Sequence, residues 1–274
     1  MPDLDRSQFI VGTSAWGSRI TVRAAIRLGA DLVAAGFTRF DSAPTYGSAY
    51  AHFALDRLAQ QTGAVLTVDT KYGQLNERNP RGLAKKILRA PSPGAFAAAL
   101  WQHSTADRMA DAFWQPARMI DAFDRARRDL QHTAPGVFYF HAPPRPVLGP
   151  DTAAISEYIA ARGATLGLSD PTPEDLEWLR DHPAQRLTVL VEVETLKRHF
   201  DVIRDLGNVD IRVHGVFRHR APPESGDTVS FRRIVEEFFV GHTQRKFVIG
   251  VNSSRSVERL ARLASETGSA GLFG

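Results

Sequence analysis

Short apolar or β-branched runs alternate along the chain with longer amphipathic stretches. The short runs predict eight strands, over Phe9–Thr13, Arg39–Ser42, Val65–Lys71, Gly136–His141, Thr165–Ser169, Leu187–Glu192, Ile211–Phe217 and Lys246–Val251. The amphipathic stretches predict helices over Val22–Ala35, Ala49–Gln60, Arg118–Leu130, Thr152–Ala161, Pro173–Asp181, Leu196–Leu206, Phe231–Val240 and Ser256–Ser265. Because strands and helices alternate in this way, we expect parallel strands joined by crossover helices.

Helix start and stop signals support these boundaries. Thr172 and Pro173 supply an N-cap and a proline at the first helical position, and Glu174 and Asp175 place acidic groups in the first turn. Gly36 and Gly207 stand where the glycine that ends a helix is expected.

Two α/β architectures fit this alternation, a closed (β/α)₈ barrel and an open doubly wound sheet. The first predicted strand lacks the Gly-x-Gly-x-x-Gly pattern, since Gly12 and Gly17 alone do not make it. We therefore predict a single TIM barrel domain over residues 1–274, a length that suits this fold. Residues 72–117 form a long gap after the third strand, and we expect a loop insertion there at the active-site face.

Composition excludes several classes of protein. The chain has 274 residues, of which 43% are hydrophobic and 23% charged, as in ordinary globular proteins. No apolar run approaches the ~20 residues of a membrane span, and the N-terminus does not resemble a signal peptide. Cysteine is absent and the net charge of +4 comes from scattered basic residues. We expect a cytoplasmic protein that binds a small-molecule substrate and neither nucleic acid nor membrane, with its oligomeric state open.

Four side chains with acid–base chemistry stand at the ends of three successive strands. Asp41 and Tyr46 follow the second predicted strand, Lys71 ends the third, and His141 ends the fourth. In a barrel these strand ends meet at the face that carries the active site. Each residue alone has a plainer explanation: a turn cap, a rim aromatic, a solvated strand end and a core histidine. Together they predict a catalytic site.

These four residue types suit proton transfer to or from a carbonyl oxygen. Tyrosine has an ordinary pKa of ~10, and we expect the ammonium of Lys71 to lower it, with Asp41 holding Lys71 by an ion pair. Tyr46 then acts as a general acid or base. His141 donates a hydrogen bond that orients the substrate oxygen.

The sequence resembles the aldo-keto reductase family over nearly its whole length. The resemblance lies in Gly36–Gly47, in Thr70-Lys71, in His141-x-Pro143 and in Gly163–Asp170, and residues 11–13 and 249–250 look like the family's first and last strands. It implies a TIM barrel oxidoreductase that transfers hydride between NADP(H), or NAD(H), and a small carbonyl or alcohol. Asp41, Tyr46, Lys71 and His141 carry over as the catalytic tetrad, with Tyr46 as proton donor. The segment Asp41–Gly47 looks closest to the sugar and pyridoxal dehydrogenase branch.

The resemblance also implies a set of cofactor contacts, several of which depart from the family's pattern. Ser169-Asp170 replaces Ser-Asn, Glu192 and Thr195 replace a glutamine and a stacking tyrosine, and the segment that contains Phe217 replaces Ser-Pro-Leu. Arg255 is the candidate for the 2′-phosphate, beside a helix start that can bind phosphate. The predicted cofactor residues are Gly12, Thr13, Ser169, Asp170, Glu192, Phe217, Asn252, Ser254 and Arg255.

These departures leave two hypotheses beside the NADP(H) reductase. The tetrad could serve a lyase, dehydratase or isomerase without cofactor, because the same groups transfer protons without hydride. Alternatively, the barrel could be a regulatory subunit without catalysis, against which the intact tetrad argues. No metal site is predicted, since the histidines, among them His199, His214, His219 and His242, lack ligand spacing.

Overall fold

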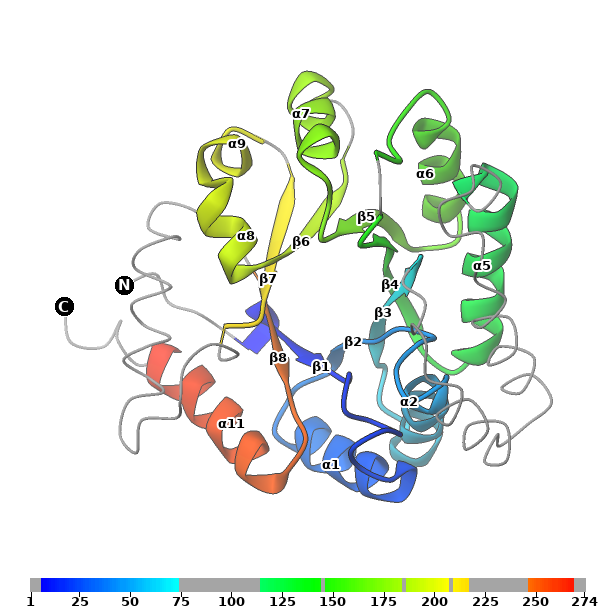
Figure 1. Cartoon of the computed structure of the whole chain (residues 1–274). Coiled ribbons are helices and arrows are strands. Elements are labelled where there is room, and N and C mark those ends of the chain that lie inside the picture. The colour runs from blue at the N-terminus through cyan, green and yellow to red at the C-terminus, as the bar shows by residue number, and fades with distance from the viewer. Residues whose placement is uncertain are drawn as a thin grey trace.

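The structure, a computed structural model, is a closed barrel of eight parallel strands in sequential order (Figure 1). It describes residues 6–73, 114–143, 146–183, 186–206, 209–216 and 246–268. The strands are β1 (Phe9–Gly12), β2 (Arg39–Asp41), β3 (Thr67–Tyr72), β4 (Ala134–His141), β5 (Thr165–Ser169), β6 (Thr188–Glu192), β7 (Asp210–His214) and β8 (Lys246–Gly250). Because β1 pairs with β8, the sheet is closed, which confirms the predicted barrel and excludes the open sheet.

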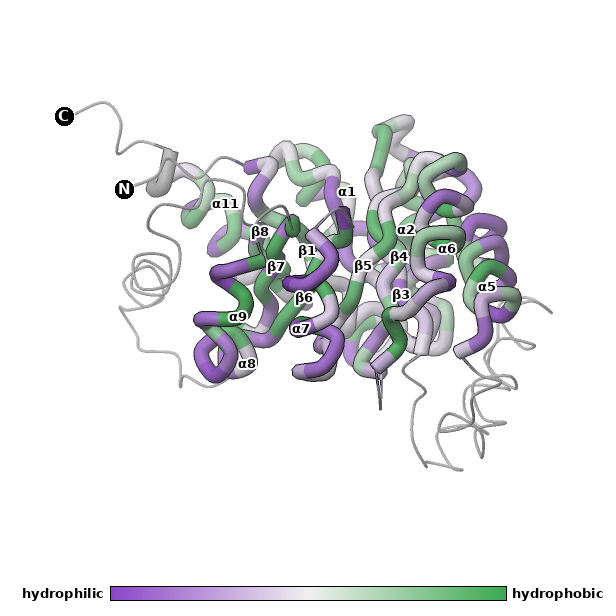
Figure 2. The backbone as a smooth tube through the Cα atoms, turned by 90° about the horizontal axis from the view of Figure 1, so that it is seen from above, coloured by the Kyte–Doolittle hydropathy of each residue, from purple (hydrophilic) through white to green (hydrophobic). Residues whose placement is uncertain are grey.

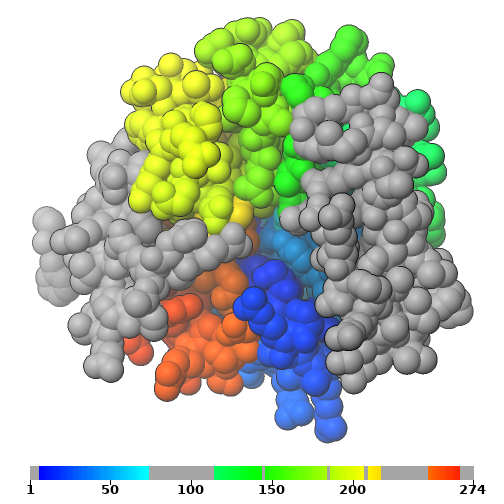
Figure 3. Space-filling model, in the orientation of Figure 1, coloured from blue at the N-terminus to red at the C-terminus, as the bar shows by residue number. Residues whose placement is uncertain are grey.

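Helices surround the strands. They are α1 (Val22–Ala34), α2 (Tyr50–Thr62), α5 (Pro116–Asp129), α6 (Thr152–Ala160), α7 (Pro173–Asp181), α8 (Val193–Arg198), α9 (Phe200–Arg204) and α11 (Ser254–Gly268), with a 3-10 turn, η1 (Arg6–Gln8), before β1. Figure 1 shows these helices around the outside of the strands, and in the space-filling view of the same orientation the segments that contain α1, α7, α8, α9 and α11 lie at the periphery (Figure 3). No helix in the described part of the chain is long and apolar enough to cross a membrane.

Three sequence predictions lie outside the described residues. They are the helix Phe231–Val240, the helix-ending role of Gly207, and all but the ends of the loop insertion 72–117. The two signals that can be checked are confirmed. Thr172 Oγ1 accepts a hydrogen bond from Asp175 N at 3.1 Å, and Gly36 follows α1 with a φ of 87°.

Two predicted boundaries are wrong. β7 ends at His214 and not at Phe217, because Gly215 turns the chain with a φ of 74°. The single helix predicted over Leu196–Leu206 is two short helices, α8 and α9, because His199 leaves the helical region with φ −116° and ψ 27°. Each short helix buries an apolar residue in the core, Leu196 in α8 and Ile203 in α9.

The strands are buried on both faces, since one face packs on the helices and the other lines the barrel. In β4, Phe138 contacts Phe123 of α5 at a ring distance of 5.4 Å, while Tyr139 joins an inner apolar cluster. That inner cluster consists of Ile10, Val137, Tyr139, Leu190 and Val248. The hydropathy colouring shows the result: the strands are mostly hydrophobic and the hydrophilic stretches lie mostly on the outer helices (Figure 2).

A buried charged network also lies inside the barrel. Arg212 is 1% exposed; its Nη1 donates to Asp69 Oδ2 and to the Tyr139 hydroxyl (2.9 Å), and its Nε donates to Asp210 at 3.1 Å. Asp69 Oδ1 also accepts from Val137 N at 2.7 Å. This approach requires Gly136, since a Cβ there would meet Asp69 Oδ1 at 2.1 Å. A charge this deeply buried is tolerated only with such partners.

Candidate functional site

The four predicted catalytic residues line one pocket of about 550 Å³. Asp41 ends β2, Lys71 lies near the end of β3, and His141 ends β4, so parallel pairing brings the three strand ends to one face of the barrel. Tyr46 lies in the turn between β2 and α2. Side chains two residues apart share a strand face, so Lys71 lies in the interior as Asp69 does. The structure therefore brings together the groups that the sequence predicted.

The turn that carries Tyr46 depends on a glycine. Tyr46 N donates to Ala43 O at 3.0 Å, which closes the turn after β2. Gly47 has a φ of 57°, and a Cβ at this position would meet the backbone oxygen of Trp16 at 2.4 Å. Trp16 is itself fixed, because its indole donates to Val251 O at 3.0 Å. The ring of Tyr46 is thus held beside the strand ends by close backbone packing.

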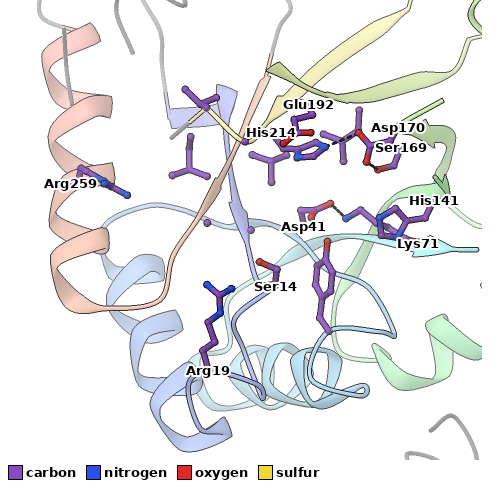
Figure 4. Close-up of a pocket in the computed structure, with 18 residues that line it drawn as sticks. Ser14, Arg19, Asp41, Lys71, His141, Ser169, Asp170, Glu192, His214 and Arg259 are labelled. Atoms are coloured by element: carbon purple, nitrogen blue, oxygen red, sulfur yellow. Dashed lines mark hydrogen bonds and ion pairs between the residues drawn. The ribbon is translucent and has the colours of Figure 1, made fainter. Parts of the chain in front are cut away.

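Asp41 and Lys71 form a buried ion pair at the centre of the pocket (Figure 4). Lys71 Nζ donates to Asp41 Oδ1 and also to Ser42 O at 3.2 Å. Burial lowers the pKa of the Lys71 ammonium, but the charges of Asp41, Tyr46 and Asp69 outweigh it, and the net pKa is raised. Burial raises the pKa of the Asp41 carboxyl, and Lys71 opposes that effect. Lys71 is therefore a permanent cation in the pocket.

The direction of the Tyr46 pKa corrects the expectation from the sequence. Burial raises the pKa of the Tyr46 phenol above its usual value, and the ammonium of Lys71, whose Nζ lies 5.3 Å from the ring centroid, only partly lowers it. The charges of Asp41 and Asp170 raise it further. The expected net lowering by Lys71 is wrong because desolvation of the phenolate is the larger effect. Tyr46 keeps its proton at neutral pH, which suits a proton donor.

Lys71→Met tests how these opposing effects combine. Without the ammonium, burial and the charges of Asp41 and Asp170 act unopposed and the Tyr46 pKa rises further. A reaction in which Tyr46 donates a proton needs the protonated phenol, so the alkaline fall in its rate should move to higher pH. The rate itself should drop by at least about tenfold because the phenolate loses its counter-ion. The measurement is the pH–rate profile beside that of Lys197→Met, a surface lysine paired with Glu194 at 3.6 Å. An unchanged profile at a normal rate would show that Lys71 does not tune Tyr46.

The opposite side of the pocket carries ionisable groups from β5, β6 and β7. Asp170 lies directly after β5, and its Oδ1 accepts a hydrogen bond from His214 Nε2 at 3.0 Å. Ser169 Oγ lies 3.5 Å from Asp170 Oδ2. Glu192 ends β6 and pairs in register with His214. Burial raises the pKa of the Asp170 carboxyl, but the hydrogen bond and charge of His214 and the charge of His141 lower it below its usual value.

The predicted cofactor residues divide between the pocket and its surroundings. Gly12, Ser169, Asp170 and Glu192 line the pocket. Thr13 is fully buried beside it, where its Oγ1 donates to Asp41 O at 2.9 Å. Phe217 lies outside the described residues. The others, Asn252, Ser254 and Arg255, are exposed around the start of α11 and do not line the pocket.

Three ionisable residues of the pocket lining were not singled out as site residues from the sequence: His214, Arg19 and Arg259. Arg19, in the loop after β1, and Arg259, on α11, bring two cations to the β1–β8 side of the pocket (Figure 4). For His214 a signal existed, because Asp210, Arg212 and His214 alternate with apolar residues and the polar face of β7 turns into the barrel. For the two arginines no local pattern distinguishes them from arginines on solvated faces.

Within the described residues, no group of three or more histidine, aspartate or glutamate side chains could hold a metal ion.

Helix α11 uses part of its N-terminal hydrogen-bonding capacity internally. Ser256 Oγ accepts from Asn252 N at 3.1 Å and from Ser253 N at 2.9 Å. Those two N–H groups are therefore already satisfied by the chain itself.

Comparisons with known proteins agree on one family. The sequence model of the aldo/keto reductase family matches residues 8–206. An aldo-keto reductase from Bacillus halodurans (holo form) is 13% identical with a TM-score of 0.61, and the match covers 96% of this chain and 90% of that one. An aldo-keto reductase from Klebsiella pneumoniae in complex with NADPH is 16% identical, with a TM-score of 0.56 and coverage of 94% and 85%.

The glycerol dehydrogenase AKR11B4 from Gluconobacter oxydans is 13% identical, with a TM-score of 0.57 and coverage of 98% of this chain and 94% of that one. At these identities the likeness shows the fold, which is the same closed barrel. No curated protein matches the chain by sequence.

Proposed function

Because the chain belongs to the aldo/keto reductase family, we propose that it is an oxidoreductase that transfers hydride between NADP(H) and a small carbonyl or alcohol substrate. The observation that carries the proposal is the buried Lys71–Asp41 ion pair in the same pocket as Tyr46 and His141. A cation held beside a protonated phenol is the arrangement that general acid catalysis at a carbonyl oxygen requires.

In this proposal each of the four residues has one role. Tyr46 donates its proton to the substrate oxygen, and its raised pKa keeps that proton available at neutral pH. Lys71 stabilises the phenolate that remains, and Asp41 fixes Lys71 by their ion pair. His141, which lines the same pocket, orients the substrate oxygen by a hydrogen bond. In the direction of alcohol oxidation the phenolate form of Tyr46 takes the proton back.

The pocket suits a nicotinamide dinucleotide at two places. Arg19 and Arg259 supply cations for phosphate groups on the β1–β8 side. Ser169 offers a donor and Asp170 an acceptor for a carboxamide on the β5 side. The bound nicotinamide supplies or accepts the hydride, which no amino-acid side chain can do. Titration of the purified protein with NADPH and NADH, followed by fluorescence or calorimetry, tests this proposal; no binding of either would contradict it.

Arg259 and Arg255 are both candidates for the 2′-phosphate, and they differ in position. Arg259 lines the pocket from α11, whereas Arg255 is exposed one turn earlier on the same helix. We expect Arg259→Gln to weaken NADPH binding by about tenfold or more, since a charge-assisted hydrogen bond contributes ~1.5–3 kcal/mol. NADH binding should change little in this variant. Arg255→Gln is the matched control; if it alone lowered NADPH affinity, the phosphate would bind at Arg255.

A further inference from the structure

A second pair of proton-transferring side chains lies in the pocket, outside the four proposed catalytic residues. His214, the last residue of β7, donates through Nε2 to Asp170 Oδ1 at 3.0 Å (Figure 4). The two side chains are 20% and 32% exposed, so they are fixed by their surroundings and still accessible to a ligand. A histidine held by a carboxylate in this way is the arrangement of a general base and the residue that orients it.

The backbone around the pair holds Asp170 in an unusual conformation. Asp170 has a φ of 52°, in the left-handed region that a residue with a side chain rarely adopts. Its N–H donates to Leu190 O at 2.7 Å, which ties it to β6. Strained backbone that is held by its neighbours is typical of functional sites. The strain here aims the carboxylate at the imidazole of His214.

The hydrogen bond also decides which nitrogen of His214 is the base. A carboxylate only accepts hydrogen bonds, so in the neutral imidazole Nε2 carries the proton and Nδ1 carries the lone pair. Nδ1 has no hydrogen-bond partner among the residues that the structure describes. Burial opposes ionisation of Asp170, but His214 and His141 lower the pKa of its carboxyl, so it remains the charged partner that a protonated imidazole needs.

The pair and the four proposed catalytic residues act on the same space. The charge of Asp170 contributes to raising the pKa of Tyr46, so the pair and the proposed proton donor are not isolated from each other. All of them line the one pocket. A carbonyl compound bound with its oxygen at Tyr46 therefore has the imidazole of His214 as a second polar neighbour.

We propose that Asp170 and His214 form a proton-transfer pair that lets this pocket exchange and move a proton on the carbon next to a substrate carbonyl. His214 Nδ1 takes the proton, and the electrons of the broken C–H bond form a carbon–carbon double bond. The carbonyl electron pair moves to oxygen, which receives the Tyr46 proton. The product is a neutral enol, or an enediol when the substrate is an α-hydroxycarbonyl compound. From the enediol, His214 Nδ1 returns its proton to the former carbonyl carbon, and the other hydroxyl gives its proton to the Tyr46 phenolate. The carbonyl then lies on the neighbouring carbon, so the substrate is isomerised and both side chains regain their starting protonation states.

This activity goes beyond hydride transfer and uses no oxidant, reductant or metal. It rests on the proposed role of Tyr46 as proton donor, but not on a bound nicotinamide. The substrate class is a small α-hydroxyaldehyde or α-hydroxyketone. Such a compound carries a carbonyl for Tyr46 and an acidic C–H beside it for His214.

The test is proton exchange in D₂O without added nicotinamide. Dihydroxyacetone, glyceraldehyde and glycolaldehyde serve as probes, and ¹H NMR follows the loss of the C–H signal and the interconversion of the first two. We expect the full chain to accelerate exchange over buffer. His214→Gln should slow it by about 100-fold, the smaller end of general acid–base effects. Asp170→Asn, which keeps shape and tolerates a positive φ, should slow it as well.

A surface pair supplies the matched control. His132 Nδ1 lies 3.0 Å from Asp56 Oδ2, outside the pocket, and His132→Gln should leave exchange unchanged. NADPH binding, measured on His214→Gln beside proton exchange, separates loss of the base from loss of a cofactor contact. The proposal would be overturned if the unmodified protein exchanged protons no faster than buffer with all three probes. It would also be overturned if the exchange rates of His214→Gln and His132→Gln were equal. If His214→Gln lost both proton exchange and NADPH binding, His214 would be a cofactor contact and not the proposed base. If the unmodified protein catalysed exchange but bound no nicotinamide, only the proposed hydride transfer would be contradicted.

Discussion

Tyr46→Phe is expected to abolish reduction of carbonyl substrates while the protein remains folded. The change removes the one proton that the proposed mechanism gives to the substrate oxygen, and general acid catalysis contributes about 10²–10⁴-fold to a rate. The phenyl ring keeps the half-buried position of Tyr46 in the turn after β2, so little packing is lost. The rate of NADPH oxidation with a panel of small aldehydes measures the effect.

A second tyrosine serves as the control for loss of a phenol. The Tyr158 hydroxyl donates to Asp124 Oδ2 at 2.9 Å between α6 and α5, and it does not line the pocket. Tyr158→Phe should therefore keep its activity. If Tyr46→Phe retained most of the turnover and the same midpoint of thermal unfolding, another group would have to be the proton donor.

The second large effect concerns the charged network inside the barrel. Arg212→Met leaves Asp69 with only the more exposed Arg39, at 3.5 Å, as an ion-pair partner, and removal of one partner of a buried ion pair costs about 3–5 kcal/mol. The side chains of Arg212 and Asp69 are at most 2% exposed, so water cannot replace the lost partner. We expect the free energy of unfolding, measured by urea denaturation, to fall by this amount.

Two further variants separate this effect from simple loss of an arginine. Arg204 pairs with Asp201 and Asp205 at 3.2 and 3.1 Å, but its side chain is 48% exposed. Arg204→Met should cost less than about 1 kcal/mol, because surface ion pairs contribute little. The double variant Arg212→Met with Asp69→Asn should recover part of the stability, since the buried carboxylate charge that lost its Arg212 partner is gone. A loss below about 1 kcal/mol in Arg212→Met itself would contradict the account of the buried pair.

Much of the fold was determined by local sequence. Alternation of apolar runs with amphipathic stretches predicts all eight strands, and each lies within a few residues of its predicted position. The break at His199 was not predictable, because no glycine or proline marks it and Leu196 and Ile203 both follow a helical pattern. Such a break depends on how each short helix packs on the barrel, which propensity does not encode.

The candidate catalytic site was predictable for a topological reason. Asp41 and His141 end β2 and β4, Lys71 is the last residue but one of β3, and parallel strands place all their carboxyl ends at one edge. Their gathering therefore needs only the order of elements along the chain. The direction of the Tyr46 pKa needed more, because desolvation and the distance to Lys71 exist only in the folded protein.

Only the tertiary structure decided which charged side chains form ion pairs across the barrel. Arg212 and Asp69 are 143 residues apart, and His214 and Asp170 are 44 apart. The residue types show that each can form an ion pair, but the partner depends on barrel register and on which strand face turns inward. The sequence alone thus determined the barrel and the gathering of its strand ends. Burial and cross-barrel distance decided which charges neutralise one another and which side chains line the pocket.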